Sequence, residues 1–246
     1  MKAVFLSDLD DTLFQTGRKC PDDVSGLKVM STLADGSPSG YATPRQQAFL
    51  SWLTTGQLIP VTARSTGVLA RVDISQAPAI CSNGGCVIQK DGRIDQVWHE
   101  RLVEQARADQ AVHEVYATLT SSLDAGAFRH WVVSENGLPL YIVIKSNIGS
   151  AADLSALAER HRECLPANWR RHSNGNNLAY LPSWLNKRHA VAYLIGQIRA
   201  EAPDTPILGI GDSLSDIGFM DLCDYAIAPT SSQFWQAATK NSDWLV

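Results

Sequence analysis

The chain has 246 residues, enough for one large domain or for a core domain that carries a smaller one. Apolar residues make up 45% and charged residues 19%, a balance that supports a packed globular core. The formal net charge is −4 with no basic block, and no apolar run approaches the roughly 18 residues of a membrane span, so neither nucleic acid nor membrane is an expected partner.

The cysteines and the N-terminal segment bear on the compartment. Five cysteines are scattered without a Cys-x-x-Cys pair, which argues against a zinc site and a disulfide scaffold: Cys20, Cys81, Cys86, Cys164 and Cys223. The apolar stretch at residues 3–6 is too short for a signal peptide. We therefore expect a soluble protein of the reducing cytoplasm.

The first 98 residues alternate β-prone runs with one helical segment. Thr43 and Gln46 predict a capping box at a helix start, with Pro44 at the first helical position. Pro60 is unfavourable in the strand that follows, because proline removes a ladder hydrogen bond. In chain order, the predicted elements are a strand at 3–6, a flap or hairpin around 36–40, a helix at 43–56, a strand at 58–61 and a hairpin at 79–88.

From about residue 101 the pattern changes to a self-contained run of helices and strands. It predicts a helix at 102–123, strands at 128–133 and 138–144 around an Asn-Gly turn, a helix at 151–164, and strands near 169–172 and 178–181. Such a run reads as an inserted α+β unit. We place this cap, or lid, domain at residues 99–182.

The remaining segments complete the core domain at residues 1–98 and 183–246. A helical pattern covers residues 187–198, and a strand is predicted at 206–210. Outside the insert, strands and helices alternate, which predicts a Rossmann-like parallel sheet with helices on both faces. The expected fold class is thus α/β with an inserted α+β cap.

Three predicted strands of the core each end in a cluster of polar residues. The clusters are Asp8 with Asp10, Thr62 with Arg64, and Asp212 with Asp216. Because ligands bind beyond the carboxyl ends of the strands in open parallel sheets, we expect the clusters to converge on one rim. Carboxylates held together repel one another and favour a cation, and an all-oxygen ligand set suits Mg²⁺.

Lys187 adds a positive charge to this rim. It lies at a helix start beside Arg188 and His189, where the helix dipole disfavours cations, so a nearby anion would explain its position. A helix N-terminus also offers N–H groups to phosphate. Carboxylates, a metal, a hydroxyl and a lysine together form a phosphoryl-transfer site, in which an aspartate nucleophile splits the reaction into two displacements.

These residues resemble the four motifs of the haloacid dehalogenase superfamily, in the right order and across nearly the whole chain. The matching features are Asp8-Leu9-Asp10-Asp11-Thr12 after a strand, Thr62 after the next strand, Lys187 at a helix start, and Gly211-Asp212 with Asp216. The insert, preceded by Ser82-Asn83-Gly84-Gly85, is similar to the cap of the Cof-like and sucrose-phosphatase-like branch. Ala63, Ser215 and Arg188 depart from the residues usual in that branch.

The resemblance implies a role for each matching position. Asp8 would be the nucleophile and a magnesium ligand, and Asp10 the general acid and base, with its backbone carbonyl on the metal. Thr62 and Lys187 would hold the phosphoryl group. Asp212 and Asp216 would complete the magnesium site, the latter directly or through water. Aspartate at position 10 argues against dehalogenase and cation-pump activity.

The predicted function is a Mg²⁺-dependent phosphatase acting on a small phosphate monoester, with a sugar phosphate suggested by polar residues of the insert. These residues and Trp184 are also compatible with ordinary surface or core positions: Lys145, Asn147, Arg170, Arg171, His172, Asn174 and Asn177. Arg64 is expected to contact a core carboxylate rather than substrate. A sugar phosphomutase with the same chemistry and a non-catalytic phospholigand-binding protein remain alternatives.

Overall fold

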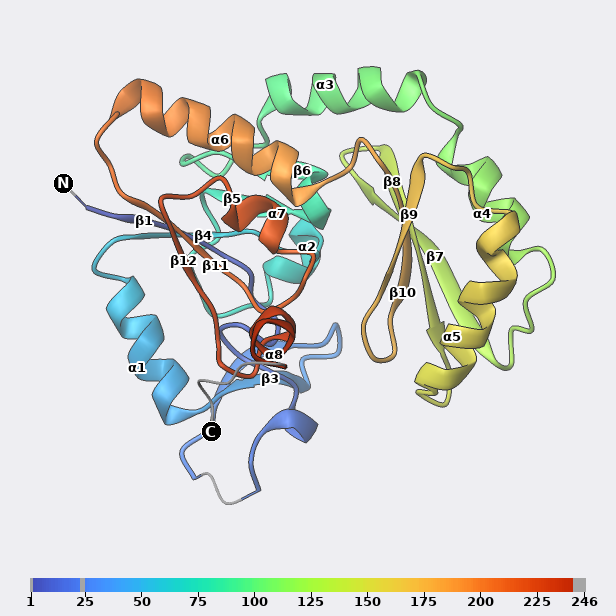
Figure 1. The fold of residues 1–246 in the computed structure, drawn as a ribbon, viewed down its shortest axis with the longest axis horizontal. Helices are drawn as coiled ribbons and strands as arrows, with labels where there is room; N and C mark the ends of the chain where they lie inside the picture. Colours follow the sequence, from blue (N-terminus) through green and yellow to red (C-terminus); the bar gives the residue numbers. More distant parts are fainter. Residues whose placement is uncertain (1, 23–24, 241–246) are drawn as a thin grey trace. The chain divides into compact units, whose positions relative to one another are not determined.

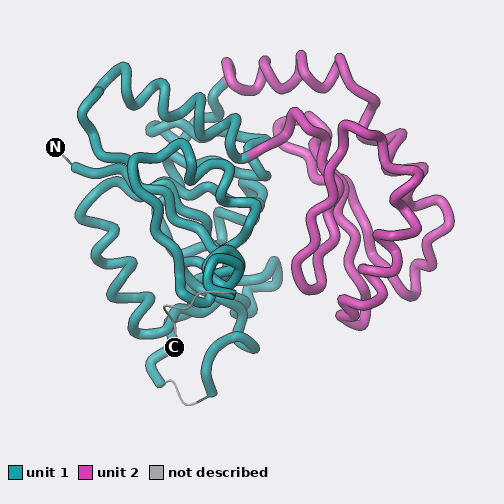
Figure 2. The backbone as a smooth tube through the Cα atoms, in the orientation of Figure 1, with its two compact units in different colours: residues 1–95, 187–246 teal, residues 96–186 magenta. Residues whose placement is uncertain are grey.

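The computed structural model describes residues 2–22 and 25–240 (Figure 1). The chain forms two compact units, which Figure 2 shows in different colours. Unit 1 comprises residues 1–95 and 187–246, and unit 2 comprises residues 96–186. The insert predicted at residues 99–182 therefore lies inside unit 2, whereas its action as a lid stays a prediction.

Unit 1 is built on a parallel sheet with β1 in its interior. The strand order is β12-β11-β1-β4, formed by Tyr225–Ile227, Ile207–Ile210, Val4–Ser7 and Gln57–Pro60. All four residues of β1 are buried, as expected for a strand with neighbours on both edges and helices on both faces. A bridge from Val61 to Ile80 links the edge of this sheet to β5, Ala79–Cys81.

Helices cover the sheet of unit 1 on both faces, which confirms the expected α/β class. In Figure 1, α1 (Pro44–Leu53) and α6 (Lys187–Glu201) lie on opposite sides of the sheet. The shorter helices of this unit are η1 (Gly17–Lys19), α2 (Thr66–Leu69), α7 (Ile217–Met220) and α8 (Gln233–Thr239). An apolar core cluster of this unit joins Phe5 of β1 to residues outside the sheet, namely Leu9, Leu13, Phe14, Met30, Leu53 and Leu69.

The start of α1 shows how local sequence sets an element boundary. The Gln46 amide donates to the Thr43 Oγ1, and the Thr43 amide donates to the Gln46 Oε1, which is the predicted capping box. Pro60 is tolerated in β4 because the neighbouring Val61 amide donates to Ser7 of β1. Successive amides alternate sides along a strand, so the Pro60 nitrogen lies on the side away from β1.

Two hairpins complete unit 1. β2 (Lys28–Thr32) pairs with β3 (Pro38–Ala42), which confirms the predicted hairpin around residue 36. β5 pairs with β6 (Cys86–Ile88) through the turn η2, Ser82–Gly84, in which all three residues have positive φ. Glycine and asparagine adopt this left-handed region most readily, which explains the Asn-Gly sequence of the turn.

Unit 2 is an antiparallel sheet packed against helices. The strand order is β7-β8-β10-β9, formed by Phe128–Glu135, Leu138–Ser146, Leu178–Pro182 and Trp169–Ser173. Asn136 and Gly137 both have positive φ in the turn between β7 and β8, as the predicted Asn-Gly hairpin requires. Helices α4 (Val112–Thr120) and α5 (Ala151–Arg160) pack on β8 through buried apolar side chains.

The helix predicted at residues 102–123 is wrong as a single element. It is divided into α3, Gln96–Arg107, and α4, with a break at Asp109. There the Asp109 carboxylate accepts hydrogen bonds from the Gln110 amide and from Asn168, far away in sequence. An aspartate that bonds its neighbouring backbone competes with helix continuation. Similarly, the helix predicted to reach residue 164 changes at Arg160 into a 3-10 turn, η3, His161–Glu163.

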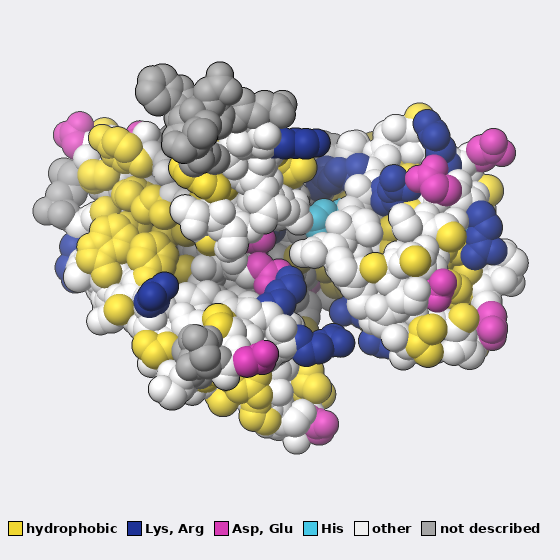
Figure 3. Space-filling model, turned by 60° about the horizontal axis from the view of Figure 1, so that its bottom comes forward, with side chains coloured by type: hydrophobic (Ala, Val, Ile, Leu, Met, Phe, Trp, Pro, Cys, Tyr) yellow, Lys and Arg dark blue, Asp and Glu magenta, His cyan; other side chains and the backbone are white. Residues whose placement is uncertain are grey.

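The surface carries no strong single-sign region on the face drawn in Figure 3. Basic and acidic side chains are interspersed there, in keeping with the small net charge of −4. Among the described helices, none has both the length and the apolar character needed to cross a lipid bilayer.

Candidate active site

The acidic residues of the predicted site lie at the carboxyl ends of two adjacent strands. Asp8 directly follows β1 and Asp212 follows β11. The two strands are in register, with Ser7 opposite Ile210, and the Asp8 amide donates to the Ile210 carbonyl at 2.9 Å. The segments that follow both strands therefore begin side by side on one rim, which confirms the predicted convergence of these two clusters.

The turn after β1 fixes the direction of its acidic side chains. Leu9, Leu13 and Phe14 are fully buried, and the Leu13 amide donates to the Leu9 carbonyl at 2.9 Å. Asp11 has a φ of 63°, a left-handed conformation that aspartate tolerates better than most residues. The apolar residues thus anchor the turn in the core, while the aspartates between them stay on the rim.

Asp8, Asp212 and Asp216 together form a buried carboxylate cluster. One carboxylate oxygen from each residue lies within 4.8 Å of the corresponding oxygens of the other two residues. Their exposed fractions are 8%, 8% and 0%, so water screens them poorly. The donor set contains only oxygen atoms, as Mg²⁺ requires.

Lys187, the first residue of α6, lies in the same cluster. Its Nζ is 2.7 Å from the Asp8 Oδ1 and 2.8 Å from the Asp216 Oδ1. The side chain is buried and passes over the ring of Phe219, with its Nζ 5.8 Å from the ring centroid. Four residues from three separate stretches of chain, Asp8, Lys187, Asp212 and Asp216, therefore meet in unit 1.

The charges of this cluster do not balance. Burial raises the pKa of Asp8 to about 8, with Lys187 opposing this effect and the Asp216 charge adding to it. Burial likewise raises the pKa of Asp212 to about 6, although a hydrogen bond from Thr12 acts to lower it. Burial also disfavours charge on Asp216, but Lys187 and Ser213 hold the pKa of that carboxyl below its ordinary value.

One ammonium group thus faces three carboxylates, and burial away from water raises the pKa of two of them despite that ammonium group. A divalent cation would supply further positive charge. The buried position, the all-oxygen ligands and the excess negative charge therefore fit Mg²⁺.

Several residues that support the cluster were given no role in the sequence analysis. Thr12 donates to the Asp212 Oδ1 at 3.0 Å, across 200 residues of sequence. The Ser213 amide and hydroxyl both donate to the Asp216 Oδ2, at 3.1 and 2.7 Å. A Cβ added at Gly211 would lie 2.6 Å from the Asp216 Cβ, so only glycine leaves room there. These residues could have been found from the sequence, because they lie inside the two acidic motifs at residues 8–12 and 211–216.

Thr62 lies at the end of β4, the neighbour of β1 on its other edge. The preceding Val61 amide donates to Ser7 at 2.7 Å, and the Thr62 side chain is buried. Its Oγ1 accepts a hydrogen bond from the Arg64 amide at 3.1 Å. The turn η2 holds this segment, because the Asn83 amide donates to the Thr62 carbonyl at 3.0 Å.

Asp10 is paired with Arg64. The Arg64 Nε donates to one carboxylate oxygen at 2.8 Å and an Nη donates to the other at 2.7 Å. Arg64 was expected to contact a core carboxylate. It does contact a carboxylate, but that of a predicted catalytic residue whose side chain is 49% exposed.

Arg170, one of the polar residues considered in unit 2, donates to the backbone carbonyl of Leu185, and two further residues of that set have structural partners. Arg171 forms an ion pair with Glu159 of α5 at 2.7 Å. The Asn147 side chain donates to the backbone carbonyls of Ala125 and Gly126. These contacts support the structural interpretation of all three residues.

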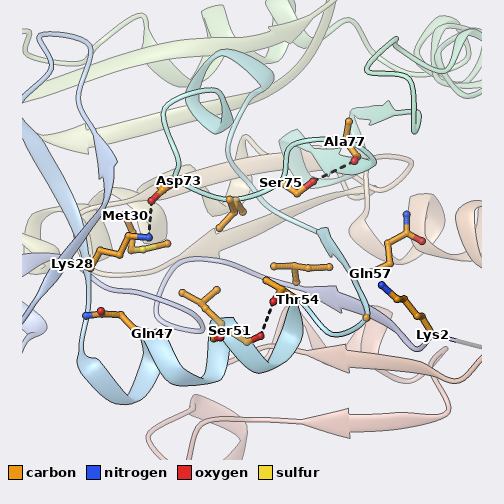
Figure 4. Close-up of a pocket in the computed structure, with 14 residues that line it drawn as sticks. Lys2, Lys28, Met30, Gln47, Ser51, Thr54, Gln57, Asp73, Ser75 and Ala77 are labelled. Carbon is orange, nitrogen blue, oxygen red and sulfur yellow. Dashed lines mark hydrogen bonds and ion pairs between the residues drawn. The ribbon is translucent and has the colours of Figure 1, made fainter.

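A separate cavity of about 750 Å³ lies in unit 1 beside α1 (Figure 4). Some of its polar residues bond to each other: Lys28 to Asp73 at 2.8 Å, and Thr54 to the Ser51 carbonyl at 2.7 Å. None of the predicted site residues lines this cavity. The carboxylate cluster therefore lies elsewhere in unit 1, outside this cavity.

Comparisons with known proteins agree with this architecture. Neither a protein-family model nor a curated protein sequence matches the chain. The sucrose-phosphatase of Synechocystis sp. PCC6803, solved in complex with sucrose and phosphate, has a similar structure, with a TM-score of 0.55 and 17% identity over 98% of this chain and 88% of that one. A Plasmodium vivax protein described as a HAD/Cof-like hydrolase matches with a TM-score of 0.54 and 10% identity over 98% of this chain and 88% of that one.

A third similar structure is that of Thermoplasma acidophilum 0175, with a TM-score of 0.50 and 14% identity over 99% of this chain and 90% of that one. At sequence identities of 10–17%, structural similarity shows the fold and does not show the activity. The chain therefore shares its fold with this sucrose-phosphatase and with the HAD/Cof-like hydrolase.

Proposed function

We propose that this protein is a Mg²⁺-dependent phosphatase that hydrolyses a small phosphate monoester through an aspartyl-phosphate on Asp8. The observation that carries the proposal is the contact of Lys187 with Asp8 and Asp216, at 2.7 and 2.8 Å, inside a buried cluster of three carboxylates. A structural ion pair would need one carboxylate for one lysine. The surplus of carboxylates supports a site for a metal and a phosphate group.

In the first step, a carboxylate oxygen of Asp8 forms a bond to phosphorus, and the bond from phosphorus to the ester oxygen breaks. Asp10 gives a proton to the departing alcohol. In the second step, water attacks phosphorus, Asp10 takes up the proton of the water, and inorganic phosphate leaves Asp8. Each displacement is easier than direct attack of water on the ester.

The remaining residues would bind the phosphoryl group and the metal ion. Lys187 and the Thr62 hydroxyl would bind oxygens of the phosphoryl group. Asp8, Asp212 and Asp216, with the Asp10 carbonyl, would hold Mg²⁺. When bound, Mg²⁺ would supply the positive charge that offsets the repulsion between an anionic nucleophile and a phosphate dianion.

A sugar phosphate is the proposed substrate class. The support is the shared fold with a sucrose-phosphatase that was solved with sucrose and phosphate, at a TM-score of 0.55. Polar residues of unit 2, such as Asn174 in the turn between β9 and β10, are compatible with hydroxyl-bearing ligands. This part of the proposal is tested by a panel of sugar, polyol and aryl phosphates.

The decisive experiment compares phosphate release by the wild type and by Asp8→Asn, each with Mg²⁺ and with excess chelator. We expect turnover to require Mg²⁺ and to fall in Asp8→Asn by about 10³-fold or more, since the uncatalysed reaction is very slow. Asp73→Asn is the matched control, because this exposed carboxylate pairs with Lys28 and should leave activity unchanged. Full activity in chelator, or in Asp8→Asn, would contradict the proposal; dependence on an added sugar bisphosphate would instead indicate a phosphomutase.

A further inference from the structure

Arg64 and Asp10 form a two-point ion pair within unit 1. The two Asp10 oxygens each accept one hydrogen bond from the guanidinium, at 2.8 and 2.7 Å. This side-by-side arrangement fixes the plane of the carboxylate as well as its distance. Arg64 therefore controls the orientation of the residue that the proposed mechanism uses for proton transfer.

The two partners are held to different degrees. The Arg64 side chain is 17% exposed, against 49% for Asp10. Its guanidinium carbon lies 5.3 Å from the ring centroid of the fully buried Phe14. Its backbone is fixed at both ends, by the hydrogen bond from its amide to Thr62 and by one from the Ser82 amide to its carbonyl at 2.8 Å. Arg64 is thus the anchored partner, and Asp10 the one with room to move.

We propose that Arg64 is the positioning residue of the reaction: it holds the Asp10 carboxyl group in place and receives the carboxylate that Asp10 becomes once it has given its proton to the departing alcohol. This inference rests on the proposed phosphatase function. In the first step the proton moves from Asp10 to the oxygen of the departing alcohol, and the resulting carboxylate can accept both hydrogen bonds from Arg64. In the second step that carboxylate takes a proton from the attacking water.

A positioning role predicts a loss that depends on the leaving group. An alkyl alcohol needs a proton as it departs, whereas p-nitrophenolate is stable enough to leave without one. Loss of Arg64 should therefore slow the release of the alcohol from a sugar phosphate far more than the release of p-nitrophenol. A merely structural role would slow both releases alike.

The experiment measures first-turnover alcohol release and steady-state kinetics with glucose 6-phosphate and p-nitrophenyl phosphate, in the wild type and in Arg64→Met and Arg64→Lys. For Arg64→Met we expect first-turnover release from the sugar phosphate to fall by about 10–100-fold, and release of p-nitrophenol to stay within about threefold. KM should change little, because Arg64 acts through Asp10. Arg64→Lys keeps the charge without the planar fork and should restore part of the loss.

Arg71→Met is the matched control. Arg71 lies in the same unit and, among the described residues, its side chain donates to the backbone carbonyls of Thr32 and Gly67, so its loss should affect neither ester selectively. Equal losses on both esters in Arg64→Met, or no loss on either, would overturn the inference while leaving the phosphatase proposal intact. If Arg64→Met does not fold, the same comparison on Arg64→Lys decides. A wild type that turns over neither ester, and forms no phosphorylated Asp8 with any member of the phosphate panel, would overturn both proposals.

Discussion

Asp8 combines a buried position with a close contact to the Lys187 ammonium group, and this combination governs its protonation. Burial raises its pKa to about 8, so near neutral pH and without a metal the carboxyl holds a proton most of the time. Asp212, with a pKa of about 6, is mostly ionised under the same conditions. A divalent cation binds ionised carboxylates, so its binding must displace the Asp8 proton.

The first prediction at this scale is that Mg²⁺ binding near pH 7 releases about one proton per ion. The affinity for Mg²⁺ should rise with pH between about 6 and about 8, the range bounded by the two raised pKa values. Titration calorimetry in two buffers of different ionisation enthalpy measures the released proton directly. Asp8→Asn, which has no proton to lose at this position, is the control. Mg²⁺ binding without proton release in the wild type would contradict the raised pKa of Asp8.

The meeting of the acidic residues could be predicted from the sequence, but their partners could not. Asp8 and Asp212 each follow a predicted strand, and parallel strands bring such positions to one edge. The hydrogen-bond partner of each carboxylate depends on side-chain directions, which the sequence does not give. One example is the bond from Thr12 to Asp212, which are 200 residues apart in sequence. The pairing of Arg64 with Asp10 likewise joins two separate loops, and neither loop alone indicates it.

At the scale of elements, the turn after β11 depends on close contact between its two ends. The added Cβ of an alanine at Gly211 would lie 2.6 Å from the Asp216 Cβ and 3.0 Å from the Met220 sulfur. Asp216 is fully buried and bonded to Lys187 and Ser213, so it has little room to yield. The glycine therefore allows the turn to bring Asp216 back to the rim.

We predict that Gly211→Ala lowers the free energy of unfolding by about 1–3 kcal/mol and reduces phosphatase activity through displacement of Asp216. Gly67→Ala is the control, because a Cβ at Gly67 of α2 meets nothing within 4 Å and alanine favours a helix. Urea unfolding and activity assays on both variants check this. Equal stability of the two variants would show that the Asp216 contact can relax.

The sequence predicts element boundaries correctly where residues close in sequence determine them, and wrongly where a long-range contact determines them. The capping box of Thr43 and Gln46 and the turn at Asn136 and Gly137 each act within a few residues. The break between α3 and α4 involves a hydrogen bond from Asn168 to Asp109, which no local pattern around residue 109 announces. Non-local bonds of this kind override helix propensity.

At the scale of the whole molecule, the site makes folding depend on pH. In the folded chain without metal, Asp8 keeps its proton up to about pH 8, whereas its ordinary pKa is 3.8. Between these values the folded chain binds more protons than the unfolded chain, so the free energy of unfolding falls as pH rises. Asp212 adds to this fall up to about pH 6. Asp216 has the opposite sign, because its lowered pKa contributes stability that is lost only as pH falls below its ordinary value of 3.8.

Urea unfolding in chelator should therefore show lower stability at about pH 8 than at about pH 5, with Asp8 responsible for most of the change above pH 6. Mg²⁺ should reverse the trend, because it binds only the folded chain and binds it more tightly as Asp8 ionises. Asp8→Asn removes the group that titrates above about pH 6 and should flatten the pH dependence in chelator from there to about pH 8. If Asp8→Asn and the wild type lost stability equally over this range, the raised pKa of Asp8 would be wrong.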